Sequence, residues 1–156
     1  MNHDDVLSPH DVVRVTQELW GPMLNLEITP VEEQGSSIPQ GIVASVQING
    51  QWIGSVRLHL SEALARRAAA AFLGVAAEEV SPEQLRDCAG ELANITAGGI
   101  KRLVPPISKI SLPDVGTAAD ASGAKGGCRR LIQTTFDHRG EKLIVTIVEA
   151  EASAQA

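Results

Sequence analysis

The sequence predicts an α+β fold, in which an antiparallel sheet built from hairpins carries long helices packed on one face. Two segments, 42–60 and 129–150, are rich in Val, Ile and Thr, and each contains a turn signal: Asn49-Gly50 in the first and His138-Arg139-Gly140 in the second. This pattern is typical of β-hairpins. The residues between the two segments carry helix-start and helix-stop signals. Because hairpins flank a helical middle, we expect one sheet with the helices on one side.

The N-terminal forty residues predict one helix and one strand. Ser8 is a typical N-cap and Pro9 suits the first helical position, so the first helix begins here and should end before Gly21-Pro22. Residues 23–29 then place Leu24, Leu26 and Ile28 on alternate positions. This alternation predicts a strand.

The first hairpin is expected to join strands 42–48 and 51–60 through Asn49-Gly50, which is the strongest short-range hairpin signal. A second helix should begin after Ser61 and end at Gly74. The third should begin at Ser81-Pro82 and run to about Val104, where Pro105-Pro106 ends it.

The C-terminal part is expected to open with an extended segment, 107–115, and a Gly-rich loop, 120–127. Strands 129–137 and 141–150 then form the second hairpin. The chain of 156 residues suits a single domain, 1–156, with residues 1–7 and 151–156 frayed.

Composition excludes several classes of function. A net charge of −6, with basic residues only in scattered pairs, argues against a nucleic-acid surface. No apolar run approaches the length of a membrane span, and the N-terminus lacks the features of a signal peptide, so we expect a cytoplasmic protein. Cys88 and Cys128 have no metal-ligand spacing, and the four histidines are widely separated. We therefore expect no metal site.

One polar stripe marks the predicted third helix. At about 100° per residue, Asp87, Glu91, Asn94 and Gly98 fall within roughly 60° of one another around the helix axis. The apolar residues of the segment lie on the other side: Leu85, Cys88, Ala89, Leu92, Thr96 and Leu103. Gly98 and Gly99 should leave the helix surface bare beside the stripe, so that another backbone can approach closely.

The chemistry of this stripe has two interpretations. Glu91 and Asn94, three residues apart, are neighbours on a helix surface. A carboxylate can pair with a partner's Lys or Arg, and a carboxamide, which both donates and accepts hydrogen bonds, can orient a water molecule. A solvated helix face carries the same residue types, however. Spacing alone leaves both interpretations open.

The surrounding residues carry a family resemblance. The stretch 90–98, Gly-Glu-Leu-Ala-Asn-Ile-Thr-Ala-Gly, closely resembles the signature helix of the CheC/CheX family of chemotaxis phosphatases. The similarity covers most of the chain after about residue 40, including the hairpin with Gly54, the extended Pro segment 110–116 and the last two strands. The single Glu-x-x-Asn resembles the single-site CheX branch. Two departures are Gly99, where many relatives have Asn, and Leu112-Pro113, where relatives often have Pro-Pro.

The resemblance implies a phosphatase for phospho-aspartate on a CheY-like receiver domain of a response regulator, in chemotaxis or related two-component signalling. Glu91 would pair with the Lys at the receiver's phosphorylation site, and Asn94 would hold the attacking water. The receiver would supply the Mg²⁺, while this chain binds no cofactor. Asp87, Gly98 and Lys101 would contact the partner at the rim of the stripe, although Asp87 and Lys101 equally suit a solvated helix surface.

The resemblance also suggests a homodimer, since relatives often dimerise through their sheets. Pro113 and the charged residues near Arg57 and Glu141 are the only obvious guards against strand addition at the sheet edges. One alternative function is a non-catalytic receiver-binding or dimerisation module of the same fold. Another is an unrelated ligand-binding α+β domain in which the stripe is plain surface.

Overall fold

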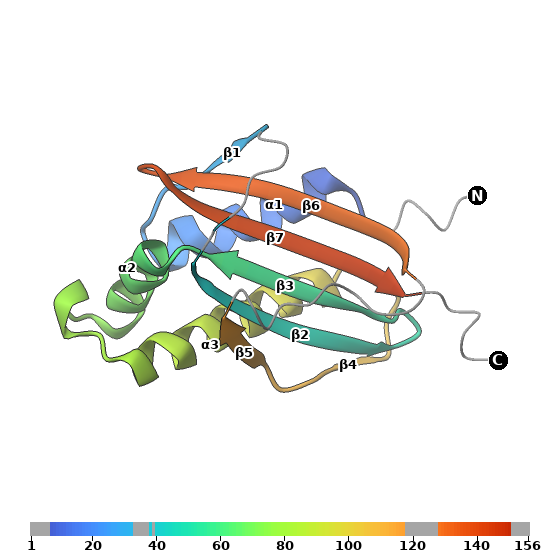
Figure 1. Cartoon of the computed structure of the whole chain (residues 1–156). Coiled ribbons are helices and arrows are strands. Elements are labelled where there is room, and N and C mark those ends of the chain that lie inside the picture. The colour runs from blue at the N-terminus through green and yellow to red at the C-terminus, as the bar shows by residue number, and fades with distance from the viewer. Residues whose placement is uncertain (1–6, 33–37, 39, 118–127, 151–156) are drawn as a thin grey trace.

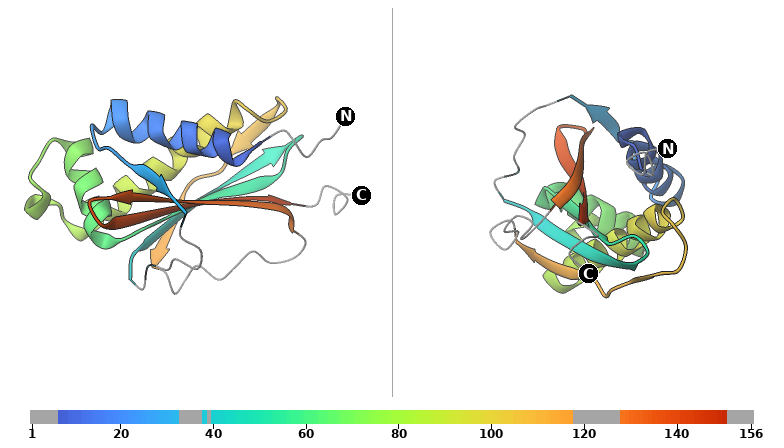
Figure 2. Two further views of the ribbon diagram at one scale, coloured as in Figure 1. Left: turned by 90° about the horizontal axis from the view of Figure 1, so that it is seen from above. Right: turned by 90° about the vertical axis from the view of Figure 1, so that its right-hand side faces the viewer.

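The computed structural model describes residues 7–32, 38, 40–117 and 128–150. Within these residues, seven strands form one antiparallel sheet, and three α-helices lie together on one of its faces (Figure 1 and Figure 2). The predicted α+β fold class is confirmed. The predicted loop 120–127 and the predicted frayed end 151–156 lie outside the described residues.

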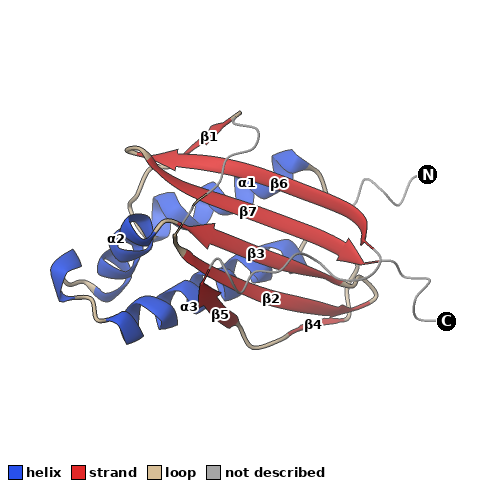
Figure 3. Ribbon diagram, viewed as in Figure 1, coloured by secondary structure: helices blue, strands red, loops and turns tan. Residues whose placement is uncertain are grey.

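The strands follow the order β1-β6-β7-β3-β2-β4, and β5 also pairs with β2 (Figure 3). Their bounds are β1 Thr29–Val31, β2 Ile42–Gly50, β3 Gly54–Leu60, β4 Ser108–Ile110, β5 Asp114–Thr117, β6 Cys128–His138 and β7 Glu141–Ala150. The two predicted hairpins, β2–β3 and β6–β7, lie side by side because β3 pairs with β7. The centre of the sheet is thus made of the four longest strands.

The helices begin where the serine signals place them. The α-helices are α1 Pro9–Glu18, α2 Glu62–Leu73 and α3 Pro82–Lys101, with a π-helical turn η2 Leu19–Met23 after α1 and a 3-10 turn η3 Ala77–Glu79 before α3. The hydroxyls of Ser8, Ser61 and Ser81 each accept a hydrogen bond from the backbone N–H three residues later. Each such cap stabilises a helix by about 1 kcal/mol. Gly74, with a φ of 71°, ends α2 as predicted.

The core lies between the sheet and the helices. Alternate residues of the central strands supply its sheet side: Ala44, Val46 and Ile48 of β2, Val56, Leu58 and Leu60 of β3, and Leu143, Val145 and Ile147 of β7. α3 packs across β2 and β3 and contributes Leu85, Leu92 and Ile100. Aliphatic side chains dominate this layer, so α3 is anchored along most of its length. Leu7, expected to fray with the N-terminus, is also buried in this core.

The predicted strand over residues 23–29 is wrong. The chain continues from α1 through Pro22 as the π-helical turn, which keeps Trp20 fully buried. Pairing with β6 begins only at Thr29, opposite Asp137. Residues 25–27 extend past the end of β6, where none of the described strands remains as a partner. Leu24 and Ile28 are still buried. The alternation of apolar residues over 23–29 therefore indicated burial of these side chains and not strand pairing.

The predicted turn at Asn49-Gly50 is also wrong. Both residues continue β2 and pair with Lys109 and Ser108 of β4. The hairpin register pairs Ile48 with Gly54, so residues 49–53 connect the paired positions, and residues 51–53 lie outside both strands. Trp52 in this connection is buried, and its ring lies where a Cβ at residue 54 would be, which explains the glycine there. Burial of one indole ring therefore overrides the local turn preference.

The second hairpin has the tight turn. Arg139 and Gly140, with φ values of 51° and 89°, connect the paired residues His138 and Glu141. Positive φ at both central residues is the signature of a type I′ turn. His138 is therefore the last residue of β6 and is buried, not part of the turn.

The edges of the described sheet differ from the expected ones. Arg57 and Glu141 lie on β3 and β7, which are interior strands, so they do not guard an edge. The edges are the short strand β1, which contains Pro30, and the short strands β4 and β5, with Pro113 between them. No described helix is both long enough and apolar enough to cross a membrane.

Candidate functional site

α3 presents two chemically different sides. Leu85, Cys88, Ala89, Leu92 and Thr96 are buried against the sheet and the other helices, as the periodicity predicted. Thr96 satisfies its hydroxyl by donating to the carbonyl of Leu92 at 2.7 Å. The buried side leaves no polar group for chemistry. Any site on this helix must lie on the other side.

The polar stripe occupies that other side. Asp87 and Glu91 are exposed, while Asn94, Gly98 and Lys101 are partly buried. Among the described residues, the side chains of Glu91 and Asn94 form no hydrogen bond or ion pair with the rest of the chain. Their polar atoms are therefore available to a second molecule. The structure places all five predicted site residues on one helix, and their roles stay predictions.

Cys88 lies just beneath the stripe. Burial raises the pKa of its thiol, and the neighbouring charges of Asp87 and Glu91 raise it further. A protonated, buried thiol is a poor nucleophile. Covalent chemistry at Cys88 is therefore not what this helix is arranged for, which fits the predicted place of Cys88 among the apolar residues of the helix.

The glycines of α3 do not all leave the surface bare. A Cβ at Gly98 would meet nothing within 4 Å, as expected for a bare patch beside Asn94. A Cβ at Gly99, by contrast, would lie 2.6 Å from Cγ1 of Val15 on α1. The expectation that Gly99 contributes to the bare surface is wrong. Gly99 lets α1 approach α3, and Gly98 alone remains open.

The extended segment between β4 and β5 borders the stripe. A Cβ at Gly90, one residue before Glu91, would lie 3.2 Å from Pro113 and from Val115, so this segment packs against α3 there. Ser111 is held to Gln47 of β2 by two hydrogen bonds of 2.9 Å. Leu112, between these anchors, is 89% exposed. Leu112 is therefore a large apolar side chain in solvent, next to the point where Pro113 packs against α3.

Leu112 is the residue that sequence reasoning missed as a site candidate. The sequence marked Leu112 only weakly, as the residue that stands where relatives often have the first proline of a Pro-Pro pair. Exposure of a single Leu depends on which strands flank it. Leu112 lies in the connection between β4 and β5, where no strand periodicity reports the exposure of a side chain.

Within the described residues, no group of three or more His, Cys, Asp or Glu side chains is placed to hold a metal ion. The chemistry that the stripe itself offers is that of one carboxylate and one carboxamide, side by side on a rigid helix. Such a pair can bind a cation and orient a water molecule.

These features define a class: an α+β domain with one antiparallel sheet, helices on one face and an exposed Glu-x-x-Asn pair on the longest helix. The family model described as chemotaxis phosphatase CheX matches residues 42–136. This chain therefore belongs to the CheX family. No curated protein matches the chain in sequence.

Solved structures share the fold. The chemotaxis protein CheX from Vibrio vulnificus is 18% identical, with a TM-score of 0.73, covering 92% of this chain and 97% of that one. A CheC-like superfamily protein from Shewanella sp. PV-4 is 21% identical, with a TM-score of 0.74, covering 97% and 100%. A chain of the CheX-CheY-BeF3-Mg²⁺ complex from Borrelia burgdorferi is 18% identical, with a TM-score of 0.71, covering 94% and 99%.

Proposed function

We propose that this protein is a phosphatase that accelerates hydrolysis of phospho-aspartate on a CheY-like receiver domain, in chemotaxis or a related two-component pathway. The observation that carries the proposal is the unpartnered Glu91–Asn94 pair on the exposed side of α3, in a chain of a family of chemotaxis phosphatases. The complex from Borrelia burgdorferi supports the choice of partner, since the CheX of that organism was solved with CheY.

Glu91 is proposed to set the register of the complex. Its carboxylate is exposed and has no ion pair among the described residues, so it can accept the ammonium group of a receiver Lys. Such a pair steers association and fixes orientation. The helix backbone beneath it is anchored by the core, so the carboxylate starts from a defined position.

Asn94 is proposed to place the attacking water. It lies one turn along α3 from Glu91 and is partly buried, which restricts its rotamers. Its carbonyl oxygen would accept a hydrogen bond from the water, and its amide would donate to a phosphoryl oxygen. The water oxygen then attacks phosphorus in line, the bond from phosphorus to the aspartyl oxygen breaks, and the aspartate leaves as a carboxylate with inorganic phosphate as the other product. Charge neutralisation would come from Mg²⁺ held by the receiver.

The rim of the stripe would complete the contact. Gly98 leaves room for a receiver backbone, and Leu112 offers an apolar contact on the side of Pro113. Asp87 and Lys101, on the same side of the helix, would tune docking electrostatically. Asp87 is exposed and Lys101 is only partly buried, so solvent screening makes each contribution small.

The test is a phosphatase assay on a panel of receiver domains from the same genome, each phosphorylated and then followed for loss of label. We expect the parent protein to accelerate the loss for at least one receiver, and Asn94→Ala to return the rate to that of the receiver alone. Misplacement of a reacting group by about 1 Å can by itself cost ~100-fold in rate. Asn49→Ala, which removes an exposed carboxamide from β2, is the matched control and should behave like the parent.

The alternative of a non-catalytic receiver-binding module makes the opposite prediction. In that case the parent would bind a phosphorylated receiver without shortening the lifetime of its phosphoryl group. Acceleration that survives Asn94→Ala would instead remove Asn94 from the mechanism.

We also propose a homodimer that leaves both stripes in solvent. The edge strands of the described sheet are short, with Pro30 in β1 and Pro113 between β4 and β5, and both features disfavour strand addition. A contact through the sheet face would use Leu131, which is exposed and points to the face opposite the helices. Light scattering at micromolar protein tests this, and a mass of one chain at every concentration would remove the dimer.

A further inference from the structure

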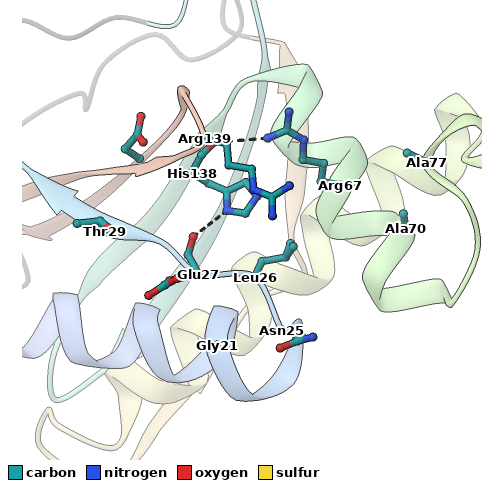
Figure 4. Close-up of a pocket in the computed structure, with 11 residues that line it drawn as sticks. Gly21, Asn25, Leu26, Glu27, Thr29, Arg67, Ala70, Ala77, His138 and Arg139 are labelled. Atoms are coloured by element: carbon teal, nitrogen blue, oxygen red, sulfur yellow. Dashed lines mark hydrogen bonds between the residues drawn. The ribbon is translucent and has the colours of Figure 1, made fainter.

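A second concave site lies away from the stripe, at the end of the sheet where β6 turns into β7. It is a cavity of about 870 Å³, within the size range of small-molecule sites. Its walls come from four segments: the π-helical turn, the residues that lead to β1, α2 with the start of η3, and the β6–β7 turn. Figure 4 shows the cavity with its lining side chains.

Two arginines concentrate positive charge in this cavity. Arg67 projects from α2 and Arg139 from the type I′ turn, and both side chains extend to the same space beside His138 (Figure 4). Among the described residues neither guanidinium has a carboxylate partner, and the one hydrogen bond of Arg67 is a long one, 3.5 Å to the carbonyl of His138. In a chain with a net charge of −6, two unpaired guanidinium groups at one place are a distinctive feature.

The acidic residues at the cavity do not neutralise these arginines. Asp137 is bound by Nζ of Lys142 at 2.9 Å and accepts a hydrogen bond from the backbone N–H of Gly140. These two partners hold the pKa of its carboxyl below the ordinary value, the Lys142 hydrogen bond contributing most. Glu27 forms no ion pair with either arginine in the described structure, and its carboxylate points away from them in Figure 4. The cavity therefore keeps a positive character.

His138 is held in one orientation at the cavity wall. It is 6% exposed, and its Nδ1 lies 2.7 Å from the carbonyl oxygen of Glu27. A carbonyl can only accept, so Nδ1 carries the hydrogen and the ring is held in a defined orientation. The same contact ties the segment before β1 to the end of β6.

The backbone at the turn adds a second observation. The first central residue of a type I′ turn has positive φ, which Asn, Asp and Gly accept most easily. Here the position is Arg139, with a φ of 51°. Asn25, with a φ of 58°, lies on the facing wall of the same cavity. A long cationic side chain stands where the turn itself favours a small residue.

We propose that this cavity binds the phosphate group of a small organic phosphomonoester. Guanidinium groups donate paired hydrogen bonds that match a phosphate. Two guanidinium groups that converge from different elements match the two negative charges of a phosphate dianion. A carboxylate ligand, with one charge, would match them less well. Leu26, Ala70 and Ala77 line the rest of the cavity and offer an apolar surface to the organic part.

The test uses adenosine 5′-monophosphate and inorganic phosphate as probes. Adenosine, which lacks the phosphate group, is the matched control. Each is titrated at millimolar concentration into ¹⁵N-labelled protein while amide shifts are followed by NMR. We expect saturable shifts at Gly21, Ala70, Ala77 and Gly140 with both phosphate probes, the monophosphate binding more tightly, and no saturable shift with adenosine.

Three variants locate the site. Arg67→Gln combined with Arg139→Gln should weaken binding at least about tenfold, because charge-assisted hydrogen bonds are lost. Arg102→Gln combined with Lys109→Gln removes the same charge from exposed positions elsewhere and should bind like the parent. Arg139→Asn suits the turn, so it should fold at least as stably as the parent and still bind several-fold more weakly.

Two results would overturn the proposal. One is the absence of saturable shifts with both phosphate probes. The other is equal weakening in the Arg102–Lys109 control, which would reduce the effect to general electrostatic attraction. Since the readout is binding and not dephosphorylation, the outcome is independent of the proposed function of the stripe.

Discussion

Gly98 and Gly99 are consecutive on α3, yet their surroundings are opposite. Gly99 is buried, and a Cβ there would collide with Val15 of α1, whereas a Cβ at Gly98 would enter open space. Each glycine destabilises the helix by about 1 kcal/mol relative to alanine. For Gly99 this cost is offset inside the molecule by the close approach of α1. For Gly98 no such contact exists among the described residues, and the proposed docking of a receiver backbone would account for this glycine.

The same division runs along the whole helix. The side that carries Leu92 and Gly99 holds the fold together, and the side that carries Glu91, Asn94 and Gly98 has no task within the described chain. Substitutions on the two sides should therefore separate stability from activity.

The largest contrast is expected between Leu92→Ala and Asn94→Ala. Leu92 is 1% exposed, so its truncation should lower the free energy of unfolding by about 2–5 kcal/mol. Asn94→Ala should change stability by no more than about 0.5 kcal/mol while removing the phosphatase activity. Urea denaturation beside the receiver assay measures both. Equal destabilisation by the two substitutions would show that the sides of α3 are not distinct.

Gly99→Ala should have the next largest effect on stability. The added methyl would force Val15 away from α3, and overpacking of this kind costs about 1–3 kcal/mol. Thermal denaturation gives the value. Combining Gly99→Ala with Val15→Ala should recover part of the loss, because the two side chains compete for one space. Strictly additive losses would mean that the α1 contact is not the reason for this glycine.

Glu91→Gln should affect recognition without affecting the fold. Loss of the carboxylate should lower kcat/KM on the receiver on the order of tenfold at low salt, and less as ionic strength rises. Asp87→Asn removes the same charge one turn earlier on the helix and should change kcat/KM by less than about threefold. If the two variants show the same loss and the same salt dependence, Glu91 contributes only to the general field of the stripe.

The smallest effect, and the sharpest test of the glycine comparison, is Gly98→Ala. The substitution should raise the free energy of unfolding by up to about 1 kcal/mol, since a better helix former enters open space. The same variant should raise KM for the receiver, because a methyl group now stands where the partner backbone approaches. A more stable protein with unchanged KM would leave Gly98 without a role in docking.

Local signals predicted the parts of the fold that depend on a few consecutive residues. The three helix starts were found because a Ser hydroxyl caps a backbone N–H only three residues away. The fold class followed from two β-rich segments around a helical middle. The placement of Glu91 and Asn94 on the exposed side of α3 followed from helical geometry alone.

Turns were decided at longer range. Asn49-Gly50 has the preferred type I′ sequence but continues β2, because β4 pairs with it and Trp52 is buried in the connection. Arg139-Gly140 adopts the tight turn although Arg is an unfavourable first residue. The register of each hairpin was therefore chosen by the burial of its strands, and the turn residues adapted.

The sequence by itself determined the α+β class, the helix starts and the exposed Glu-x-x-Asn pair, since each rests on periodicity or on contacts within one turn of the chain. The tertiary structure alone decided which glycine faces α1, that Leu112 stands in solvent beside the stripe, and that Arg67 meets Arg139 at one cavity. These features join residues far apart in the chain. Their positions depend on how the helices dock on the sheet, and no local pattern encodes that docking.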